Sequence, residues 1–479
     1  MSLGKKTVSG IAWTFSQQFS VQLITFIVQI VLARLLSPKE FGLIAMLAVF
    51  IGIGNSLVDS GLTSSLIRTP DAGQRDYSTV FFINLAGSII VYFSLFFAAP
   101  LIAEFYNQGE LLISIIRVYT LSFIIRAFVS VQTTILTKAM NFKIQMMMQI
   151  PSVIAGAAVG IFLAYRGYGV WSLVWYELTH TSLFTLQHWF HSKWYPQLIF
   201  DRQRLKQHFL FGYKLTLAGI LNIIFNNIYT LVIGKFYSAG QLGFYNRADT
   251  FRMMPVQNIS TALSKVTYPM FALIQDDDVK LRSAYKKLMQ QVCFWVSATM
   301  VLAIIVSEPV FKFILTDKWM PAVPYFQILC IPAILYPLQV YNLNILTVKG
   351  RSDLFLRLEI FKKAVIAAGV LAALPFGIYG LLYVQIAIAI VSFYINSYYS
   401  GKLIGYHVGA QMIDILPTFA LAAAVGLLVY AANLYFYSQV SDLLKICLSA
   451  FLFFGTFIGG AYLMKMAALH DFKTLILKR

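Results

Sequence analysis

Apolar segments of about 20 residues, the length that crosses the hydrocarbon core of a bilayer, recur along almost the whole sequence of 479 residues. Hydrophobic residues make up 59% of the chain and charged residues 12%, against about 45–50% and about 25% in an ordinary soluble domain. No soluble core absorbs that much apolar sequence, so we expect an all-α polytopic membrane protein of about fourteen transmembrane helices. The expected spans lie near 10–34, 41–66, 78–103, 111–137, 146–165, 168–190, 209–234, 243–273, 286–306, 321–347, 355–374, 379–400, 413–434 and 443–464.

Lysine and arginine residues predict how the chain is oriented. The formal net charge of +18 would suggest nucleic acid in a soluble protein, but here the basic residues lie in short segments between spans, which excludes that partner. With the N-terminus inside, 24 of them fall in cytoplasmic segments and 7 in outer segments. This bias follows the positive-inside rule and predicts that both termini are cytoplasmic. Lys5 and Lys6 precede an apolar run too long for a cleaved signal peptide, so we expect a retained first helix.

The sequence contains an internal repeat. The pattern Arg34-x-x-Ser37-x-x-Glu40-Phe41-Gly42 returns, 201 residues later, as Lys235-x-x-Ser238-x-x-Gln241-Leu242-Gly243. Ile135–Thr137 matches Ile345–Thr347 at an offset of 210 residues, and Pro100 matches Pro309 at an offset of 209. We therefore expect two six-helix halves related by a pseudo-two-fold axis along the membrane normal. The predicted division is a six-helix bundle at 1–195, a second at 196–402, and two additional helices with a basic cytoplasmic tail at 403–479.

Polar residues follow one face of two repeat-related helices. In the first helix they recur at helical spacing, and in the seventh the repeat offset places polar residues at matching positions. Two interpretations remain open: hydrogen bonds between helices, or a hydrated cavity between the halves, which the symmetric placement favours. The residues are Gln18, Gln22, Thr25 and Gln29, and on the seventh helix Asn222, Asn226 and Thr230.

Basic residues inside spans mark candidate ligand sites, because charges in hydrocarbon are costly and usually face protein or water. Arg126 shares a polar stripe on the fourth helix, whereas Arg117 lies about half a turn away. Arg252 is expected near mid-membrane, and Lys214 and Lys265 near the cytoplasmic mouth. A cavity with several cations suits an anionic ligand such as a diphosphate. The alternative for Arg252 is simple neutralisation by Asp249, three residues earlier.

Acidic residues inside spans are few. Asp59 and Glu177 are candidates for coupling to a proton or a sodium ion, although an internal salt bridge or a buried neutral acid is the stronger interpretation. The sequence shows no Gly-rich phosphate loop, no His/Cys metal spacing and no catalytic triad outside the bilayer. The run Asp276–Asp278 lies beside Lys280 and is expected to be a solvated turn. We therefore predict a protein that is not an enzyme and that has no cofactor and no metal site.

Four stretches resemble a known family. Leu32–Gly42, Tyr168–Trp175, Gly243–Ala248 and Lys318–Pro324 are similar to stretches in the Wzx-type polysaccharide exporters of the multidrug/oligosaccharidyl-lipid/polysaccharide (MOP) superfamily. Within it they resemble the branch that includes colanic acid and teichuronic acid exporters. The resemblance covers nearly the whole chain. It indicates the branch of the family but does not identify the sugar that would be transported.

The resemblance implies a location in the bacterial cytoplasmic membrane and a fold of two six-helix bundles with two peripheral helices. It implies a flippase or exporter that translocates undecaprenyl-diphosphate-linked oligosaccharide by alternating access for cell-surface polysaccharide biosynthesis. The implied partners are this lipid-linked oligosaccharide, membrane lipids, a polysaccharide polymerase and a chain-length regulator. No functional residue is carried over from the family, so the candidate residues rest on helical face and depth.

Three other functions remain alternatives. Two belong to the same superfamily, namely a peptidoglycan lipid-precursor flippase and a cation-coupled multidrug exporter. An exporter of organic cations should present uncompensated acids, whereas here the intramembrane cations of the fourth, seventh and eighth helices outnumber the acids. The third is a membrane polysaccharide polymerase, which would need an exposed catalytic loop, and the longest gap between spans is about 191–208.

The predicted topology can be tested with single cysteines. Cysteines placed in 191–208 and near the C-terminus should react with thiol reagents only from the cytoplasm, because the basic residues of these segments keep them inside. Labelling of intact cells with an impermeant maleimide, compared with labelling of inverted vesicles, measures this. Periplasmic labelling of either segment would contradict the count of fourteen spans.

Overall fold

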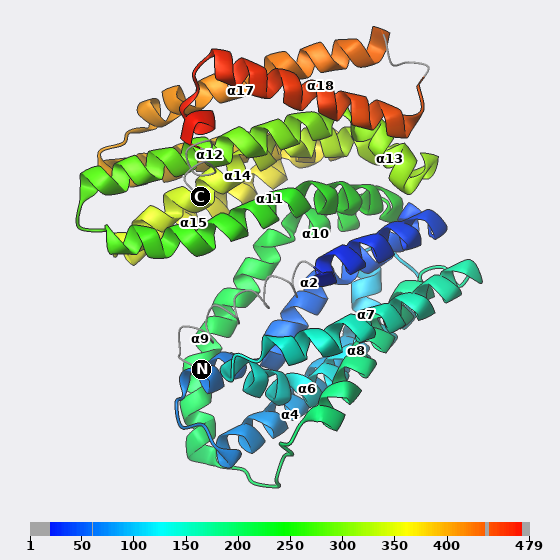
Figure 1. The fold of residues 1–479 in the computed structure, drawn as a ribbon. Coiled ribbons are helices and arrows are strands. Elements are labelled where there is room, and N and C mark those ends of the chain that lie inside the picture. The colour runs from blue at the N-terminus through cyan, green and yellow to red at the C-terminus, as the bar shows by residue number, and fades with distance from the viewer. Residues whose placement is uncertain (1–19, 60, 436–439, 472–479) are drawn as a thin grey trace. The chain divides into compact units, whose positions relative to one another are not determined.

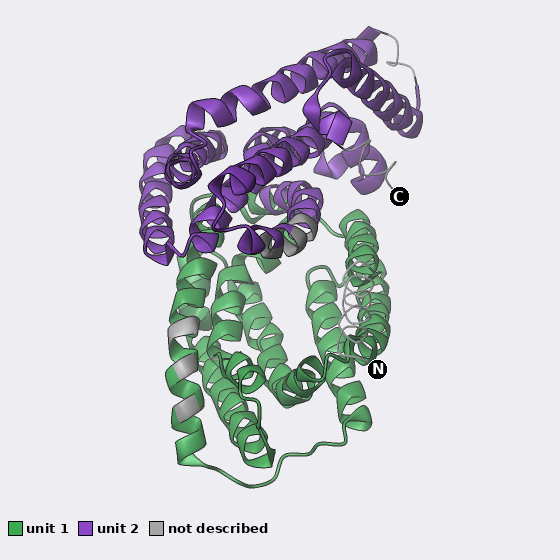
Figure 2. Cartoon of the chain, turned by 60° about the vertical axis from the view of Figure 1, so that its left-hand side comes forward, with its two compact units in different colours: residues 1–243 green, residues 244–479 purple. Residues whose placement is uncertain are grey.

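The computed structural model describes residues 20–59, 61–435 and 440–471, and all its regular elements in these ranges are helices (Figure 1). The expectation of an all-α membrane protein is confirmed. The chain divides into two compact units, Met1–Gly243 and Phe244–Arg479 (Figure 2). The first unit contains the helix Ser20–Leu35, α2 (Pro38–Asp59), α3 (Leu62–Arg68), α4 (Gln74–Phe105), α5 (Glu110–Tyr119), α6 (Leu121–Lys138), α7 (Phe142–Tyr165), α8 (Trp171–His191), α9 (Arg202–Asn226) and α10 (Ile228–Phe236).

The second unit takes in nearly all of α11 (Ala239–Leu273), whose first turn belongs to the first unit. It continues with α12 (Asp278–Ile305), α13 (Ser307–Leu315), the 3-10 turn η1 (Asp317–Trp319), α14 (Ala322–Val348), α15 (Ser352–Ala373), the 3-10 turn η2 (Leu374–Phe376), α16 (Gly377–Ile404), α17 (Val408–Tyr435) and α18 (Asp442–Leu463). The boundary follows packing, whereas the predicted division at 195 and 402 follows the repeat. That division stays a prediction.

Helices that could cross a membrane occur in both units. Nine helical segments of the described chain are long and apolar enough to cross a bilayer, or ten if the bent pair formed by Thr216–Asn226 and Ile228–Phe236 is one span. One of the nine, Ser352–Ile404, has 53 residues. At 1.5 Å per residue it would be ~80 Å long, more than twice the thickness of the hydrocarbon core. The exact count of fourteen stays a prediction.

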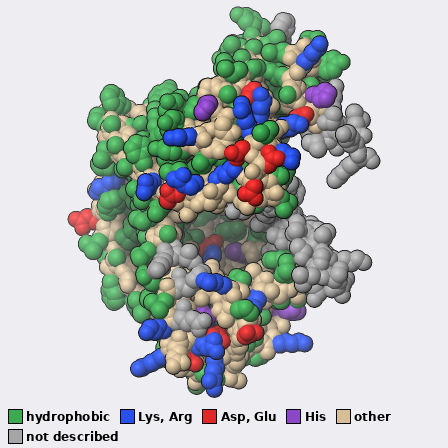
Figure 3. Space-filling model, turned by 90° about the vertical axis from the view of Figure 1, so that its left-hand side faces the viewer, with side chains coloured by type: hydrophobic (Ala, Val, Ile, Leu, Met, Phe, Trp, Pro, Cys, Tyr) green, Lys and Arg blue, Asp and Glu red, His purple; other side chains and the backbone are tan. Residues whose placement is uncertain are grey.

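The exposed surface is that of a protein surrounded by lipid. Large hydrophobic side chains that are more than half exposed occur on many helices, for example Phe97 on α4, Phe162 on α7 and Phe451 on α18. Figure 3 shows one face, on which hydrophobic side chains cover broad areas while charged side chains gather in groups. In water such large apolar patches would cause aggregation, and in a bilayer they contact acyl chains.

Small residues set the packing in the first unit. A Cβ atom added to Gly156 on α7 would lie 2.7 Å from the carbonyl oxygen of Tyr176 on α8, and one on Gly160 would lie 2.9 Å from the Cβ of Tyr176. Without a hydrophobic driving force between helices in lipid, such close approach supplies van der Waals contact instead. The seam between α7 and α8 therefore depends on residues without side chains.

The long helix α9 packs along α2 and α3 in the same way. Gly61, at the break between α2 and α3, has a left-handed backbone (φ 64°), and a Cβ there would lie 2.8 Å from the Cα of Gly212. Farther along, a Cβ on Gly52 would lie 2.7 Å from the side chain of Ile223. The hydroxyl of Ser56 also donates to the carbonyl of Thr216 at 3.5 Å. These contacts attach the seventh expected span to the first unit.

Aromatic and polar contacts hold the second unit. Phe294 on α12 packs against Phe457 on α18 with ring centroids 4.7 Å apart, in a buried cluster that also includes α17. Between α14 and α16, the Asn342 amide donates to the hydroxyl of Ser397 at 3.0 Å. A buried polar group in a membrane interior is costly unless it is hydrogen-bonded, so this contact favours the packing of α14 on α16. The two additional helices expected at the C-terminus, α17 and α18, thus pack on α12.

The α7–α8 seam can be tested by adding side-chain volume. Gly156→Val should lower the free energy of unfolding by ~1–3 kcal/mol, the usual cost of overpacking, because the new methyl groups meet the backbone of Tyr176. Gly87→Val on α4 is the matched control, since nothing lies within 4 Å of a Cβ at that helical glycine. Thermal unfolding in detergent measures both variants, and equal losses would show that the seam does not limit stability.

Candidate functional site

The predicted polar stripe of the first helix is partly described. Gln18 lies outside the described residues, while Gln22, Thr25 and Gln29 are half-buried. Thr25 forms a hydrogen bond with Tyr176 of α8. At least one member of this stripe therefore contacts the interior of its own unit.

The stripe of the seventh expected span lies on two helices. Asn222 and Asn226 are exposed on α9, and Thr230 is buried on α10. The two helices meet at an angle of 51°, and Asn227 at the break donates from its amide to the carbonyl of Ile223 at 2.8 Å. Because the helix axis changes direction at the break, the three residues do not lie along one straight helix.

Arg126 and Glu177 form an ion pair between α6 and α8. Glu177 also accepts a hydrogen bond from Thr181 at 3.2 Å. One turn from this pair, the amide of Gln149 on α7 lies 3.2 Å from Nε2 of His180. The structure thus brings together a predicted ligand-binding cation and a predicted coupling acid. The Arg126 side chain is 47% exposed and that of Glu177 is 15% exposed, so the cation keeps accessible surface.

Arg252 is in a different situation, because all three guanidinium nitrogens have protein partners. Nε and Nη2 donate to Asp249 at 2.7 and 2.6 Å, and Nη1 donates to the carbonyl of Leu329 on α14 at 3.0 Å. Only 13% of the side chain is exposed. The arrangement matches the neutralisation alternative, and it leaves Arg252 less surface for a ligand than Arg126 has.

The remaining predicted residues are partly described. Lys214 and Lys265 lie within α9 and α11, and their side chains lie outside the described part of the chain. Asp59, near the end of α2, accepts a hydrogen bond from the hydroxyl of Thr63 on α3. Neither observation tests a role in binding or coupling.

A buried charged cluster was missed by sequence reasoning. His208 on α9 is 0% exposed, and its ring nitrogens lie 3.1 Å from the Asp76 carboxylate on α4 and 2.8 Å from the Ser65 hydroxyl on α3. Asp76, 2% exposed, also accepts from the Gly73 amide at 3.0 Å and faces Arg204 at 3.4 Å. The cluster ties the N-terminal part of α9 to α3 and α4. The only sequence signal was an acid three residues into a helix, which does not identify a partner 132 residues away.

The four stretches that carry the family resemblance pack in two pairs, one pair in each unit. In the first unit, a Cβ on Gly169 would lie 3.5 Å from the carboxyl carbon of Glu40. In the second, the Arg247 guanidinium lies 5.5 Å from the ring centroid of Trp319, a cation–π distance, and Phe244 contacts the same ring edge-on. These stretches are therefore packing motifs, which explains why they mark a branch without identifying a sugar.

Metal-binding groups are not found in the described part of the chain, where no three His, Cys, Asp or Glu side chains are grouped to hold an ion. Asp277 caps α12 by accepting from the Lys280 amide at 3.0 Å and pairs with the Lys280 ammonium at 2.9 Å. These two contacts lower the pKa of Asp277. The acidic run 276–278 is therefore a charged turn in which Asp277 is held by its contacts with Lys280.

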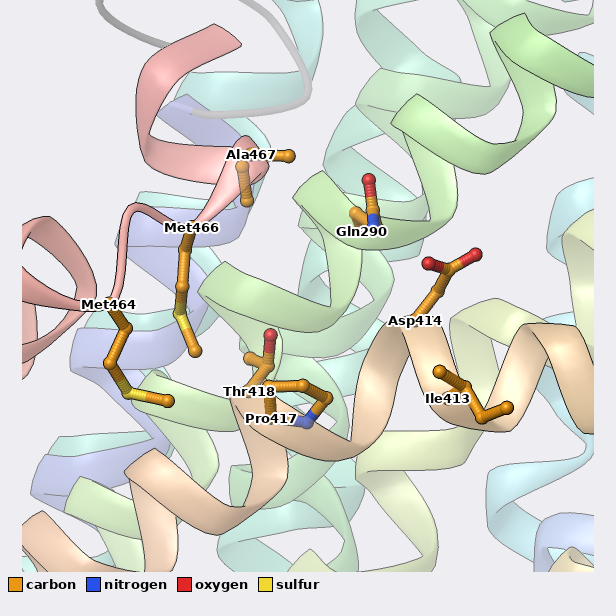
Figure 4. A pocket seen from close by; sticks show the side chains of 9 residues that line it. Gln290, Ile413, Asp414, Pro417, Thr418, Met464, Met466 and Ala467 are labelled. Atoms are coloured by element: carbon orange, nitrogen blue, oxygen red, sulfur yellow. The ribbon is translucent and has the colours of Figure 1, made fainter.

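A small cavity of about 290 Å³ lies in the second unit, among α12, α17 and the segment after α18 (Figure 4). Asp414 on its wall pairs with Lys286 at 2.8 Å and accepts from the Tyr406 hydroxyl at 2.5 Å. Met464 and Met466 line the opposite part. None of the predicted site residues lines this cavity.

Comparison with known proteins gives consistent results. Residues 31–324 match the family described as polysaccharide biosynthesis protein. The teichuronic acid biosynthesis protein TuaB of Bacillus subtilis (strain 168) is 25% identical over 439 residues, 90% of each chain. The lipopolysaccharide biosynthesis protein WzxC of Escherichia coli (strain K12) is 26% identical over 402 residues, 82% of each chain.

Two solved structures share the fold. The lipid II flippase MurJ in an inward closed conformation aligns with a TM-score of 0.75 at 12% identity, over 95% of this chain and 99% of that one. An inward-facing multidrug resistance MATE family transporter of the MOP superfamily aligns with a TM-score of 0.60 at 17% identity, over 80% and 95% of the two chains. The architecture is therefore that of these transporters.

The buried cluster in the N-terminal part of α9 can be tested by removing one charge. Asp76→Asn should lower the free energy of unfolding by ~3 kcal/mol, the cost of breaking a buried charged pair, because His208 and Arg204 lose the negative charge that both face. Asp71→Asn, in the exposed turn before α4, is the control and should change little. Thermal unfolding measures both, and an unchanged Asp76→Asn would show that the cluster does not hold α9 in place.

Proposed function

The chain belongs to the polysaccharide biosynthesis protein family, and from this premise we propose that it is a flippase of the bacterial cytoplasmic membrane. Its substrate is an oligosaccharide linked to undecaprenyl diphosphate, carried from the cytoplasmic to the outer leaflet by alternating access. Two relatives that match most of the chain are named for teichuronic acid and lipopolysaccharide biosynthesis. The observation that carries the proposal is this family membership together with the transporter fold.

The charges in the described part of the membrane region favour an anionic ligand over an organic cation. Glu177 is paired with Arg126, and Asp249 with Arg252, so both acids are compensated. An exporter of organic cations would need an acid that is free to bind one. A diphosphate instead needs a cation with accessible surface, and Arg126 has it.

Within this proposal the four cations act in order of depth. Lys214 and Lys265, expected near the cytoplasmic mouth, attract the diphosphate first, and Arg126 and Arg252 receive it deeper in the membrane. Arg126 is the principal binding residue among them, because Arg252 is already bound to Asp249 and Leu329. The polar stripes of the first and seventh spans hydrate the path between them.

The ion pair between Arg126 and Glu177 suggests how coupling to a proton or a sodium ion would work. A diphosphate that binds Arg126 competes with Glu177 for the same guanidinium. Glu177 is then left without its counter-charge, and an uncompensated carboxylate in the membrane is costly. Uptake of a cation by Glu177 would remove that cost, so substrate binding and cation binding would favour each other. Asp59 is the second candidate acid.

The remaining parts of the proposal concern orientation and assembly. Both termini are placed in the cytoplasm, and the repeat halves at 1–195 and 196–402 move against each other while 403–479 stays peripheral. A polysaccharide polymerase would take over the lipid-linked oligosaccharide at the outer leaflet, together with a chain-length regulator. No catalytic step is assigned to this chain.

The proposed function is tested by the leaflet in which the lipid-linked oligosaccharide accumulates. Arg126→Ala should reduce export about tenfold or more, as expected for loss of a charge-assisted contact worth ~1.5–3 kcal/mol, and the oligosaccharide should accumulate in the inner leaflet. Arg117→Ala is the matched control and should keep most export. The Arg117 guanidinium stacks 4.3 Å from the Phe96 ring and donates to the carbonyl of that residue at 3.4 Å. If single oligosaccharide units accumulated in the outer leaflet after deletion of this protein, the result would instead indicate a polymerase.

A double variant separates ligand binding from simple charge balance. If Arg126 only neutralises Glu177, then Arg126→Ala combined with Glu177→Gln removes the unpaired acid and should restore export. If Arg126 binds the diphosphate, the double variant should stay as inactive as Arg126→Ala. Restored export would contradict the proposed role of Arg126.

A further inference from the structure

The small cavity of the second unit has a polar wall and an apolar wall (Figure 4). Gln290 of α12 and Asp414 of α17 lie on the polar side, and Met464 and Met466, where α18 ends, lie on the other. All these elements belong to the second unit. The volume of about 290 Å³ is at the lower end of the range of ligand sites, ~300–1,000 Å³. The cavity therefore has room for the headgroup of a lipid but not for a whole lipid or an oligosaccharide.

The polar wall presents charges of both signs. One oxygen of the Asp414 carboxylate lies 2.8 Å from the Lys286 ammonium, and the other accepts from the Tyr406 hydroxyl at 2.5 Å. A carboxylate oxygen accepts about two hydrogen bonds, so each can accept one more. Lys286 is 44% exposed, and the guanidinium of Arg282, one turn earlier on the same face of α12, lies 5.6 Å from the centroid of the Tyr406 ring. The wall can thus bind an ammonium group at the acid and a phosphate at the two cations.

The cavity lies where three expected spans meet the cytoplasmic surface. Gln290, Asp414 and Met464 each lie within about one helical turn of the end of an expected span, and the predicted topology places all three ends inside. Ile413 and Met464, which line the cavity, are more than half exposed. The apolar side of the cavity is therefore open to surrounding lipid, while its charges lie at the level of the lipid headgroups.

These charges favour one class of occupant. The transport substrate proposed above carries a diphosphate, which the Asp414 carboxylate would repel, and an anionic phospholipid such as phosphatidylglycerol meets the same repulsion. Phosphatidylcholine has a cationic headgroup, but its quaternary nitrogen has no N–H to donate. Phosphatidylethanolamine has an ammonium group with three N–H donors and a phosphate close to it, so it matches both charges of the wall.

We propose that this cavity binds the headgroup of a phosphatidylethanolamine molecule of the cytoplasmic leaflet. The ammonium donates to Asp414, and the phosphate binds Lys286 and Arg282. The acyl chains pass Met464 and Met466, whose flexible side chains adapt to an irregular partner. Because α12, α17 and the segment after α18 all line the cavity, the bound lipid holds the two additional helices on α12. This inference does not depend on what the protein transports.

The choice of lipid can be measured directly. Native mass spectrometry of the purified full-length protein in detergent gives the affinity for each added lipid. Phosphatidylethanolamine should bind about tenfold more tightly than phosphatidylcholine or phosphatidylglycerol, as expected for one charge-assisted hydrogen bond. Equal binding of the three lipids, or tighter binding of phosphatidylglycerol, would overturn the proposal.

A soluble ligand with the same headgroup is the alternative source of this chemistry. Glycerophosphoethanolamine has the ammonium and the phosphate but no acyl chains. It should not displace phosphatidylethanolamine at equal concentration, because the chains that contact the apolar wall are missing. Displacement at equal concentration would show that the site takes a soluble molecule and would overturn the assignment to a lipid.

Removing the acid tests which residue selects the lipid. Asp414→Asn should lower the affinity for phosphatidylethanolamine about tenfold, to the level of phosphatidylcholine, because the ammonium loses its counter-charge. Asp353→Asn is the matched control, since Asp353 is a surface acid of the same unit that pairs with Arg351 at 3.0 Å. The control should keep the preference for phosphatidylethanolamine.

Filling the cavity tests the site without changing its charges. Ala467 is an exposed residue of the lining, so Ala467→Trp should exclude the headgroup and abolish the preference for phosphatidylethanolamine. Ala424→Trp, at an exposed position of α17 outside the lining, is its control. If Asp414→Asn does not fold, this pair decides the question. A preference that survives in Ala467→Trp would place the lipid elsewhere and overturn the proposal.

Discussion

Close contact between helix backbones at small residues is the interaction on which this structure depends. Lipid is as apolar as a leucine side chain, so burying apolar surface between helices gains little in a membrane. Helices then associate where they fit closely, and the described chain does so at Gly156 and Gly160 between α7 and α8 and at Gly61 and Gly212 between α3 and α9. Gly42 and Gly243, which the repeat offset relates, meet in the same way, since a Cβ on Gly42 would lie 3.1 Å from the amide nitrogen of Gly243.

Charge compensation is the second constraint. An unpaired charge in hydrocarbon is costly, and three acids on the long helices are met by cationic or histidine partners: Glu177 by Arg126, Asp249 by Arg252, and Asp76 by His208 and Arg204. These pairs differ in accessibility. The Asp76–His208 pair is almost fully buried and serves to attach α9, whereas Arg126 keeps nearly half of its side chain exposed. Exposure of the cation, rather than pairing alone, distinguishes a candidate binding residue from a structural one.

The sequence by itself determined the class of the protein, its helical nature and its repeat. Hydropathy does this because a backbone in lipid must satisfy its own hydrogen bonds, which leaves helices as the structure that long apolar runs form. The family resemblance also followed from sequence, through four stretches such as Leu32–Gly42 and Lys318–Pro324 that the family comparison supports. The repeat offset of 201 residues even paired the correct glycines, without indicating that they touch.

Only the tertiary structure decided which polar residues meet. Helical periodicity assigns a side chain to a face of its own helix, but not to the neighbour which that face contacts. Arg126 therefore looked like a free cavity cation until α8 brought Glu177 beside it. For Arg252 the sequence already offered Asp249 as a partner on the same helix, and only the packing of α14 added the carbonyl of Leu329. The pairing of Asp76 with a histidine 132 residues away likewise depends on contact between segments far apart in the chain. The sequence around each residue does not identify such a partner. The partner is known only when the helices are packed and their surfaces are seen to fit.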